Sequence, residues 1–136
     1  MVLEFKRIDD KQVPLFDKDW EELNEEVGMP YRRDRYSFGI FLDGKAVGYF
    51  DLKIAGGRCY VHEIIIRKEF RREGLGKEAF VWIEDFAMKR GCHKVSLKTT
   101  GKYMIIGLAK KLGYKEEAVL KDDAFHMDWI FLSKHL

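Results

Sequence analysis

The dipeptide Asp43-Gly44, set between two runs of strand-forming residues, is the feature that most constrains the fold of this chain. Tyr36 to Leu42 precedes it and Ala46 to Ile54 follows it. Asp-Gly in this setting indicates a tight hairpin, because glycine tolerates the positive φ that such turns need. Gly56-Gly57 marks a second turn, and Cys59 to Ile66 then predicts a third strand. The sequence therefore predicts a three-stranded antiparallel meander.

The hydrophobic pattern changes to a helical period after Gly76. Apolar residues recur there at three- and four-residue steps as far as Gly91, a typical residue just past a helix end. The other predicted elements are an opening strand from Leu3 to Ile8, an acidic helix from Pro14 to near Gly28, a buried strand from His93 to Thr99, a short helix from Ile105 to Leu112, and closing strands from Tyr114 to Leu120 and from Phe125 to Leu132.

This order of elements predicts an α/β fold with a mixed, mostly antiparallel central sheet flanked by helices. The chain has 136 residues, a length that usually forms one compact domain. We therefore predict a single domain spanning residues 1–136. Exposed strand edges in such a sheet would permit a homodimer.

The composition excludes several classes of protein. Hydrophobic residues make up 46% of the chain and charged residues 35%, a balance that argues against disorder. The apolar runs are too short to span a bilayer and no secretory signal is visible, so we expect a cytoplasmic protein without a membrane partner. Cys59 and Cys92 are too few for a disulfide framework and lack the spacing of a zinc site, so no metal is expected. The net charge is +2, which disfavours a nucleic-acid partner.

The junction between the third strand and the next helix reads Arg71-Arg72-Glu73-Gly74-Leu75-Gly76-Lys77. Its glycines allow the backbone to approach an anion closely, and the free N–H groups of a helix start can then hold a phosphate or pyrophosphate. Two arginines and a lysine add positive charge there. The spacing matches neither a Walker loop nor the three-glycine dinucleotide fingerprint. The alternative interpretation is a strand-to-helix turn with solvated charges.

Two stretches resemble the GNAT superfamily of acyl-CoA-dependent N-acyltransferases. Arg71-x-x-Gly74-x-Gly76 is similar to the family's motif Arg/Gln-x-x-Gly-x-Gly/Ala, in the same place between a meander and an amphipathic helix. Leu108-Ala109-Lys110-Lys111-Leu112-Gly113-Tyr114 is similar to the family's helix that ends in Lys-Leu-Gly-Phe before a hairpin.

The resemblance implies that acetyl-CoA is the co-substrate and binds between splayed central strands. Its pyrophosphate would lie on the N–H groups from Arg71 to Lys77, and its pantetheine arm would pair with the backbone of Ile64, Ile65 and Ile66. Lys102 stands at the position of a frequent family asparagine and is included among the expected cofactor-binding residues. The implied reaction transfers an acetyl group to a primary amine of a small molecule or protein, by direct attack in a ternary complex.

Direct attack needs a base, since an alkyl amine with a pKa near ~10.4 is protonated at neutral pH. The family often places a carboxylate on the strand before the motif. Here two residues compete: His62, whose ordinary pKa near ~6.5 suits a base, and Glu63, which points to the opposite face if the strand is regular. The alternatives are a structural sheet histidine and an ordinary surface carboxylate.

The family's usual proton donor, a tyrosine, is replaced by Ala109. Alanine donates no proton, although water could protonate a thiolate whose conjugate acid has a pKa near ~8.5. This departure leaves a second hypothesis open, a non-catalytic acyl-CoA-binding module. A third is a nucleotide- or RNA-binding domain that uses Arg71, Arg72 and the run from Arg32 to Arg35, and it predicts strongly salt-dependent binding.

Overall fold

The computed structural model describes residues 1–30 and 32–136. Contacts along the chain separate it into two compact units, residues 1–32 and residues 33–136, and each is described by itself. That residues 1–136 act as one domain stays a prediction. No helix among the described residues has the length and apolar character needed to cross a membrane.

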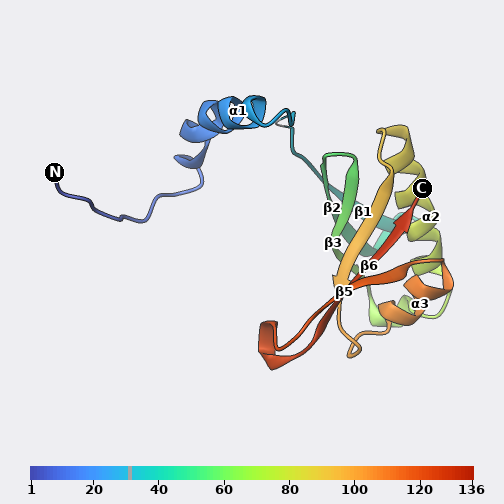
Figure 1. Cartoon of the computed structure of the whole chain (residues 1–136). Helices are drawn as coiled ribbons and strands as arrows, with labels where there is room; N and C mark the ends of the chain where they lie inside the picture. Colours follow the sequence, from blue (N-terminus) through green and yellow to red (C-terminus); the bar gives the residue numbers. More distant parts are fainter. Residues whose placement is uncertain (31) are drawn as a thin grey trace. The chain divides into compact units, whose positions relative to one another are not determined.

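The first unit contains the predicted acidic helix but not the predicted strand. A 3-10 turn, Val13–Phe16, leads into helix α1, Asp17–Glu26, which ends before Gly28 in a left-handed conformation (Figure 1). The prediction of a strand from Leu3 to Ile8 is wrong, because these residues have no regular structure and are exposed. Alternating apolar residues make a strand only where a neighbouring strand accepts their backbone hydrogen bonds, and no described strand pairs with them.

The second unit is a six-stranded sheet in the order β1-β2-β3-β4-β6-β5. Only the β3–β4 pair is parallel among the described strands, so the predicted mixed, mostly antiparallel α/β fold is confirmed. The elements are β1 (Asp34–Leu42), β2 (Lys45–Ala55), β3 (Arg58–Ile66), α2 (Leu75–Lys89), β4 (Lys94–Thr99), α3 (Ile105–Lys111), β5 (Lys115–Leu120) and β6 (Trp129–His135), with 3-10 turns at Lys68–Phe70 and Ala124–His126.

The last strand begins later than the sequence predicts. Residues 124–128 form the turn of the β5–β6 hairpin, in which Phe125 and His126 have positive φ. The turn is closed by a hydrogen bond from Asp123 N to Met127 O and another from Trp129 Nε1 to Ala124 O. A turn fixed by these hydrogen bonds replaces the extended backbone that the apolar pattern favours.

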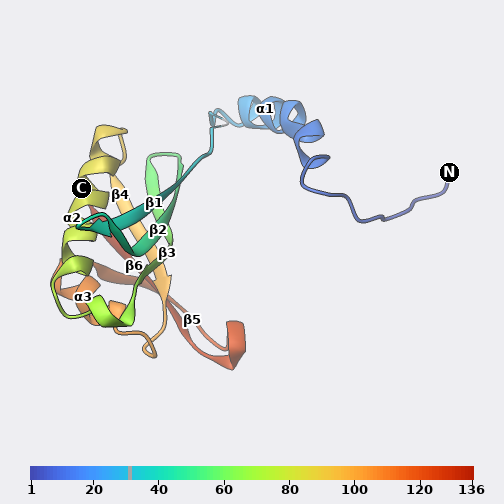
Figure 2. The ribbon, with the colours of Figure 1, turned by 180° about the vertical axis from the view of Figure 1, so that it is seen from behind.

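The hydrophobic core lies between one face of the sheet and helices α2 and α3 (Figure 2). Phe80 and Ile83 of α2 are completely buried, and each contributes about 1.5–3 kcal/mol by leaving water. Tyr36 and Phe38 of β1 also reach this face, since the Phe38 ring lies 4.8 Å from that of Trp82. Side chains alternate along a strand, so Arg35 and Ser37 project from the opposite face.

Candidate active site

The backbone of the β3–α2 junction presents a row of unpaired N–H groups. Arg72 has φ 67° and Gly74 has φ 81°, both left-handed, and the first helical hydrogen bond runs from Glu78 N to Gly74 O at 3.1 Å. The N–H groups of residues 72–77 donate to no acceptor among the residues that the structure describes. Together with the dipole of the 15-residue helix, they form a favourable environment for an anion.

The charged side chains of this junction divide into two roles. Arg71 Nε donates to the carbonyl oxygen of Ile66 at 2.8 Å, so Arg71 ties the loop to the end of β3. Arg72, Glu73 and Lys77 are exposed. The positive charge available to an anion therefore comes chiefly from Arg72 and Lys77, beside the unpaired N–H groups.

Glycine is required at the two motif positions for different reasons. Gly74 needs its left-handed backbone, and a Cβ there would meet nothing within 4 Å. Gly76 has no such φ, but a Cβ there would lie 2.9 Å from Leu108 Cδ2. The close approach at Gly76 is therefore to α3, whereas Gly74 is needed for its left-handed backbone. That these glycines make room for a ligand stays a prediction.

The second half of β3 has a free edge. The register of β3 with β4 ends at Val61 opposite Leu97, and residues 63–66 pair only with β2 within the described chain. In this half, Ile64 packs against the core, Ile65 is 51% exposed and Ile66 is half-buried. The 3-10 turn Lys68–Phe70 separates this edge from the row of N–H donors in the junction.

His62 lies at a β-bulge, which corrects the assumption of a regular strand. Asp51 is opposite Glu63 and Leu52 is opposite Val61, so His62 is the extra residue. The core-facing residues on either side, Val61 and Ile64, are three positions apart instead of two. His62 and Glu63 consequently both contact residues on the sheet face opposite α2.

The partner of His62 is Asp51, a buried carboxylate that the sequence reasoning missed. His62 Nδ1 lies 3.4 Å from Asp51 Oδ2. Arg35 Nη2 donates to the same oxygen at 2.8 Å, and Arg35 Nε donates to Oδ1 at 3.3 Å. Ser37 Oγ also donates to Oδ1, at 3.4 Å. The Arg35 hydrogen bond lowers the pKa of Asp51 although burial opposes this, and the His62 contact lowers it further.

Glu63 has a different partner on the same face. The Tyr49 hydroxyl donates a hydrogen bond to Glu63 Oε2. This bond, with a smaller effect of burial, raises the pKa of Tyr49 above its ordinary value. Glu63 is thus held by a neutral phenol, whereas His62 faces an ionised carboxylate.

The structure brings no proton donor to the position of the family's tyrosine. Ala109 is completely buried in the core, and Lys102 lies exposed in the turn after β4. The Tyr114 hydroxyl lies 3.4 Å from Glu84 Oε2, and burial raises its pKa strongly, so it is no acid for this site. Burial also raises the pKa of Cys59 to about 12, which removes it as a nucleophile.

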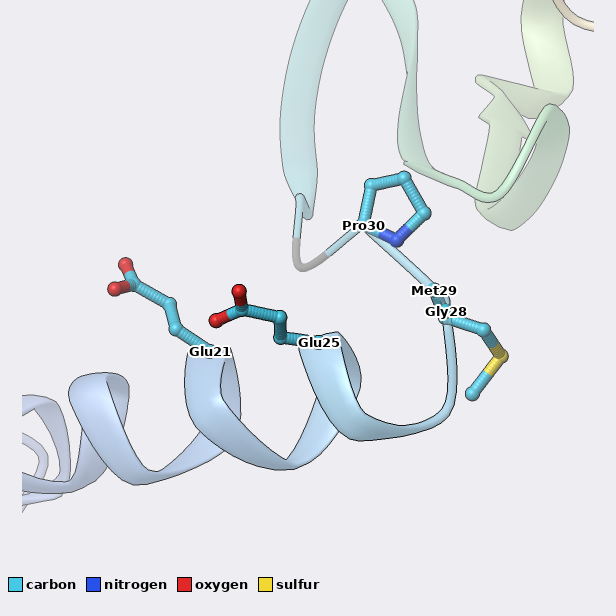
Figure 3. Close-up of a pocket in the computed structure, with 5 residues that line it drawn as sticks. All are labelled: Glu21, Glu25, Gly28, Met29 and Pro30. Carbon is cyan, nitrogen blue, oxygen red and sulfur yellow. The ribbon is translucent and has the colours of Figure 1, made fainter.

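The first unit has a shallow hollow of its own beside the end of α1 (Figure 3). It is lined by Glu21, Glu25, Gly28, Met29 and Pro30. Figure 3 shows the two carboxylates, one helical turn apart, extending toward the same side. Across the described residues, no group of three or more His, Cys, Asp or Glu side chains is arranged to hold a metal ion.

Comparison with known proteins identifies the family of this chain. The model of the acetyltransferase (GNAT) family matches residues 5–114. The chain therefore belongs to the GNAT acetyltransferase family, whose typical co-substrate is acetyl-CoA. No curated protein matches it.

Solved structures share the fold at low sequence identity. An acetyltransferase from Bacillus cereus ATCC 14579 is 17% identical with a TM-score of 0.79, over 98% of each chain. A protein from Agrobacterium tumefaciens, described as a candidate acetyltransferase, is 17% identical with a TM-score of 0.80 over 100% of each chain. A candidate streptothricin acetyltransferase from Bacillus anthracis, solved in complex with acetyl coenzyme A, is 15% identical with a TM-score of 0.69, over 81% of this chain and 67% of the other.

Proposed function

We propose that this protein transfers an acetyl group from acetyl-CoA to a primary amine of a small molecule or protein, by direct attack in a ternary complex. The observation that carries the proposal is the row of unpaired N–H groups at residues 72–77, which follows the free edge of β3 after one 3-10 turn. Family membership supports the reaction class, and the unpaired N–H groups of the junction support a ligand that carries a pyrophosphate.

The residues of the junction suit acetyl-CoA. The N–H groups of residues 72–77 would bind the pyrophosphate, with Arg72 and Lys77 supplying charge. The backbone of Ile64, Ile65 and Ile66 would pair with the amides of the pantetheine arm, as an added strand does. An N–H group on this edge would also donate to the thioester oxygen as negative charge develops there. Lys102 would contribute only a solvated charge.

We assign the base to His62. Its Nε2 would take one proton from the ammonium form of the amine, and the neutral nitrogen then forms a bond to the thioester carbonyl carbon. As the carbon–sulfur bond breaks, the nitrogen gives up a second proton to water, and CoA leaves as a thiolate and takes a proton from water, which a thiol pKa near ~8.5 permits. The products are the acetylated amine, CoA and one net proton, the one that His62 returns to solvent. Glu63 is the competing base, on the same face of the sheet.

Turnover and binding measured together test this function. Release of free thiol from acetyl-CoA is followed with a panel of amines, while calorimetry measures CoA affinity. We expect His62→Gln to lower kcat by ~10²–10⁴-fold, the usual contribution of a general base, with little change in CoA affinity. Glu63→Gln is the matched variant, and a larger loss there would move the base to Glu63.

A second function is favoured by one observation. Ala109 is buried and offers no acid, so the chain could bind acyl-CoA without turning it over. CoA binding with no thiol release across a broad amine panel would establish this non-catalytic module. Nucleic-acid binding is the third candidate, and a flat response of any such binding to salt would exclude it. Cytoplasmic location and a homodimer stay predictions.

A further inference from the structure

The β-bulge places a base and a buried carboxylate together. Asp51 lies opposite Glu63 in the register, and the extra residue, His62, brings its Nδ1 to 3.4 Å from Asp51 Oδ2. Asp51 is 3% exposed, whereas the His62 side chain is 36% exposed. One side of the imidazole therefore faces the buried carboxylate, and another part of the ring reaches solvent.

Asp51 can act toward His62 only as an acceptor. Its two oxygens already accept hydrogen bonds from Arg35 and Ser37, which keeps the group ionised, and an ionised carboxylate has no proton to donate. His62 Nδ1 must then carry the hydrogen, and in a neutral imidazole this leaves the lone pair on Nε2.

We propose that Asp51 is a positioning residue, which holds His62 in the tautomer whose Nε2 is free to accept the proton of the acceptor amine. This inference rests on the proposed function for its role in turnover. Asp51 also faces the imidazolium that forms when His62 takes the proton. The sequence leaves His62 and Glu63 as the two candidate bases, and Asp51 gives a physical reason to choose His62.

Among the described residues, the charged groups near His62 already have partners. Arg35 is paired with Asp51 from β1, Glu63 is bonded to Tyr49 of β2, and the Tyr60 ring lies 6.2 Å from the His62 ring. Arg35 also determines how the side-chain amide of an asparagine would be oriented in place of Asp51. Because its guanidinium only donates, it would hold the amide oxygen and turn the NH₂ group toward His62 Nδ1.

The first test is the tautomer of His62, read by nitrogen NMR of the histidine-labelled protein at a pH where the ring is neutral. We expect the Nδ1–H form in the unaltered protein and the Nε2–H form in Asp51→Asn. Asp85→Asn, a change in an exposed α2 pair with Lys89, is the matched control and should leave the tautomer unchanged. An Nε2–H form in the unaltered protein overturns the proposal without any variant.

The second test is kinetic. Asp51→Asn should lower kcat by at least ~10-fold, part of the ~10²–10⁴-fold that a general base supplies, and should leave the KM for acetyl-CoA unchanged. In a His62→Gln background the same change should have no further effect on kcat; an equal loss in both backgrounds would overturn the proposal.

The two tests separate the possible failures. If no amine is acetylated, the proposed function fails, while the tautomer measurement still decides whether Asp51 orients His62. If acetylation occurs but Asp51→Asn changes neither the tautomer nor kcat, the proposed function stands and the positioning role is overturned.

Discussion

The two halves of β3 are alike in apolar content and differ in their neighbours. In the first half, Cys59 and Val61 are buried, and residues 58–61 pair with β2 on one side and β4 on the other. In the second half, residues 63–66 keep the β2 pairing and have no pairing with β4. The first half stabilises the fold, and the second half is the part that, under the proposed function, would pair with acetyl-CoA. Hydrophobic residues in one strand can therefore serve opposite purposes, decided by register.

The largest expected effect is on the junction that continues the second half. Gly74→Val should weaken CoA binding about 100-fold, equivalent to roughly 3 kcal/mol of lost charge-assisted hydrogen bonds, because a β-branched residue resists the left-handed backbone. Calorimetry measures the affinity. Gly56→Val is the matched control, since Gly56 also has positive φ and open space around its Cβ position but lies in the β2–β3 turn. Equal losses of CoA affinity in both variants would contradict the assignment of the loop.

A pair of substitutions within β3 tests the comparison directly. Val61→Ala, in the first half, should lower the free energy of unfolding by about 2 kcal/mol, since Val61 is 3% exposed. Ile65→Ala, in the second half, should change stability by less than about 0.5 kcal/mol because Ile65 is 51% exposed. Ile65→Ala alone should weaken CoA binding. Denaturant unfolding and calorimetry on both variants measure these effects, and the reverse pattern would break the distinction between the halves.

The bulge should make stability depend on pH through Asp51. Its pKa is lowered in the folded protein, so it stabilises the fold fully above the ordinary aspartate pKa of ~3.9, and this contribution is lost as the pH falls through the folded value. The difference in unfolding free energy between the unaltered protein and Asp51→Asn should therefore be largest near neutral pH and shrink in acid. Denaturant unfolding at several pH values measures it. A difference that grows in acid would contradict the lowered pKa.

The smallest expected effect concerns Lys102, in the turn after β4. Lys102 follows β4 and is exposed, so its charge is screened by solvent and salt. Lys102→Ala should weaken CoA binding by less than about threefold, and the difference should vanish at high salt. A loss of CoA affinity comparable to that of Gly74→Val would show that the turn after β4 also binds the co-substrate.

Local signals in the sequence were enough to predict the meander and the start of α2. Asp43-Gly44 fixes a turn between adjacent strands, and Gly74 fixes a left-handed residue at a helix start, so each works through its own backbone. The opening strand and the start of β6 were predicted wrongly because both depend on partners elsewhere in the chain. An apolar alternation does not say whether such a partner is present.

The base and its partner could be predicted only in part. His62 was a candidate by its residue type, but a β-bulge has no characteristic residue, so its contact with Asp51 could not be foreseen. Asp51 gives one signal, a carboxylate between the apolar residues Phe50 and Leu52, which calls for a cation nearby. That cation, Arg35, is 16 residues away on another strand, and only the β1–β2 register brings the two together.

The short register between β3 and β4 has a consequence for cooperativity. These strands share four register pairs, from Arg58–Lys94 to Val61–Leu97. They join the meander of β1, β2 and β3 to the other three strands of the sheet, β4, β6 and β5. A ligand that pairs with the free edges of both strands would lengthen this seam. At a concentration 100 times its Kd, it would raise the free energy of opening by ~2.7 kcal/mol. Hydrogen exchange in the second half of β3 would then slow together with exchange across β4, so that the sheet opens as one unit when occupied and as two when empty.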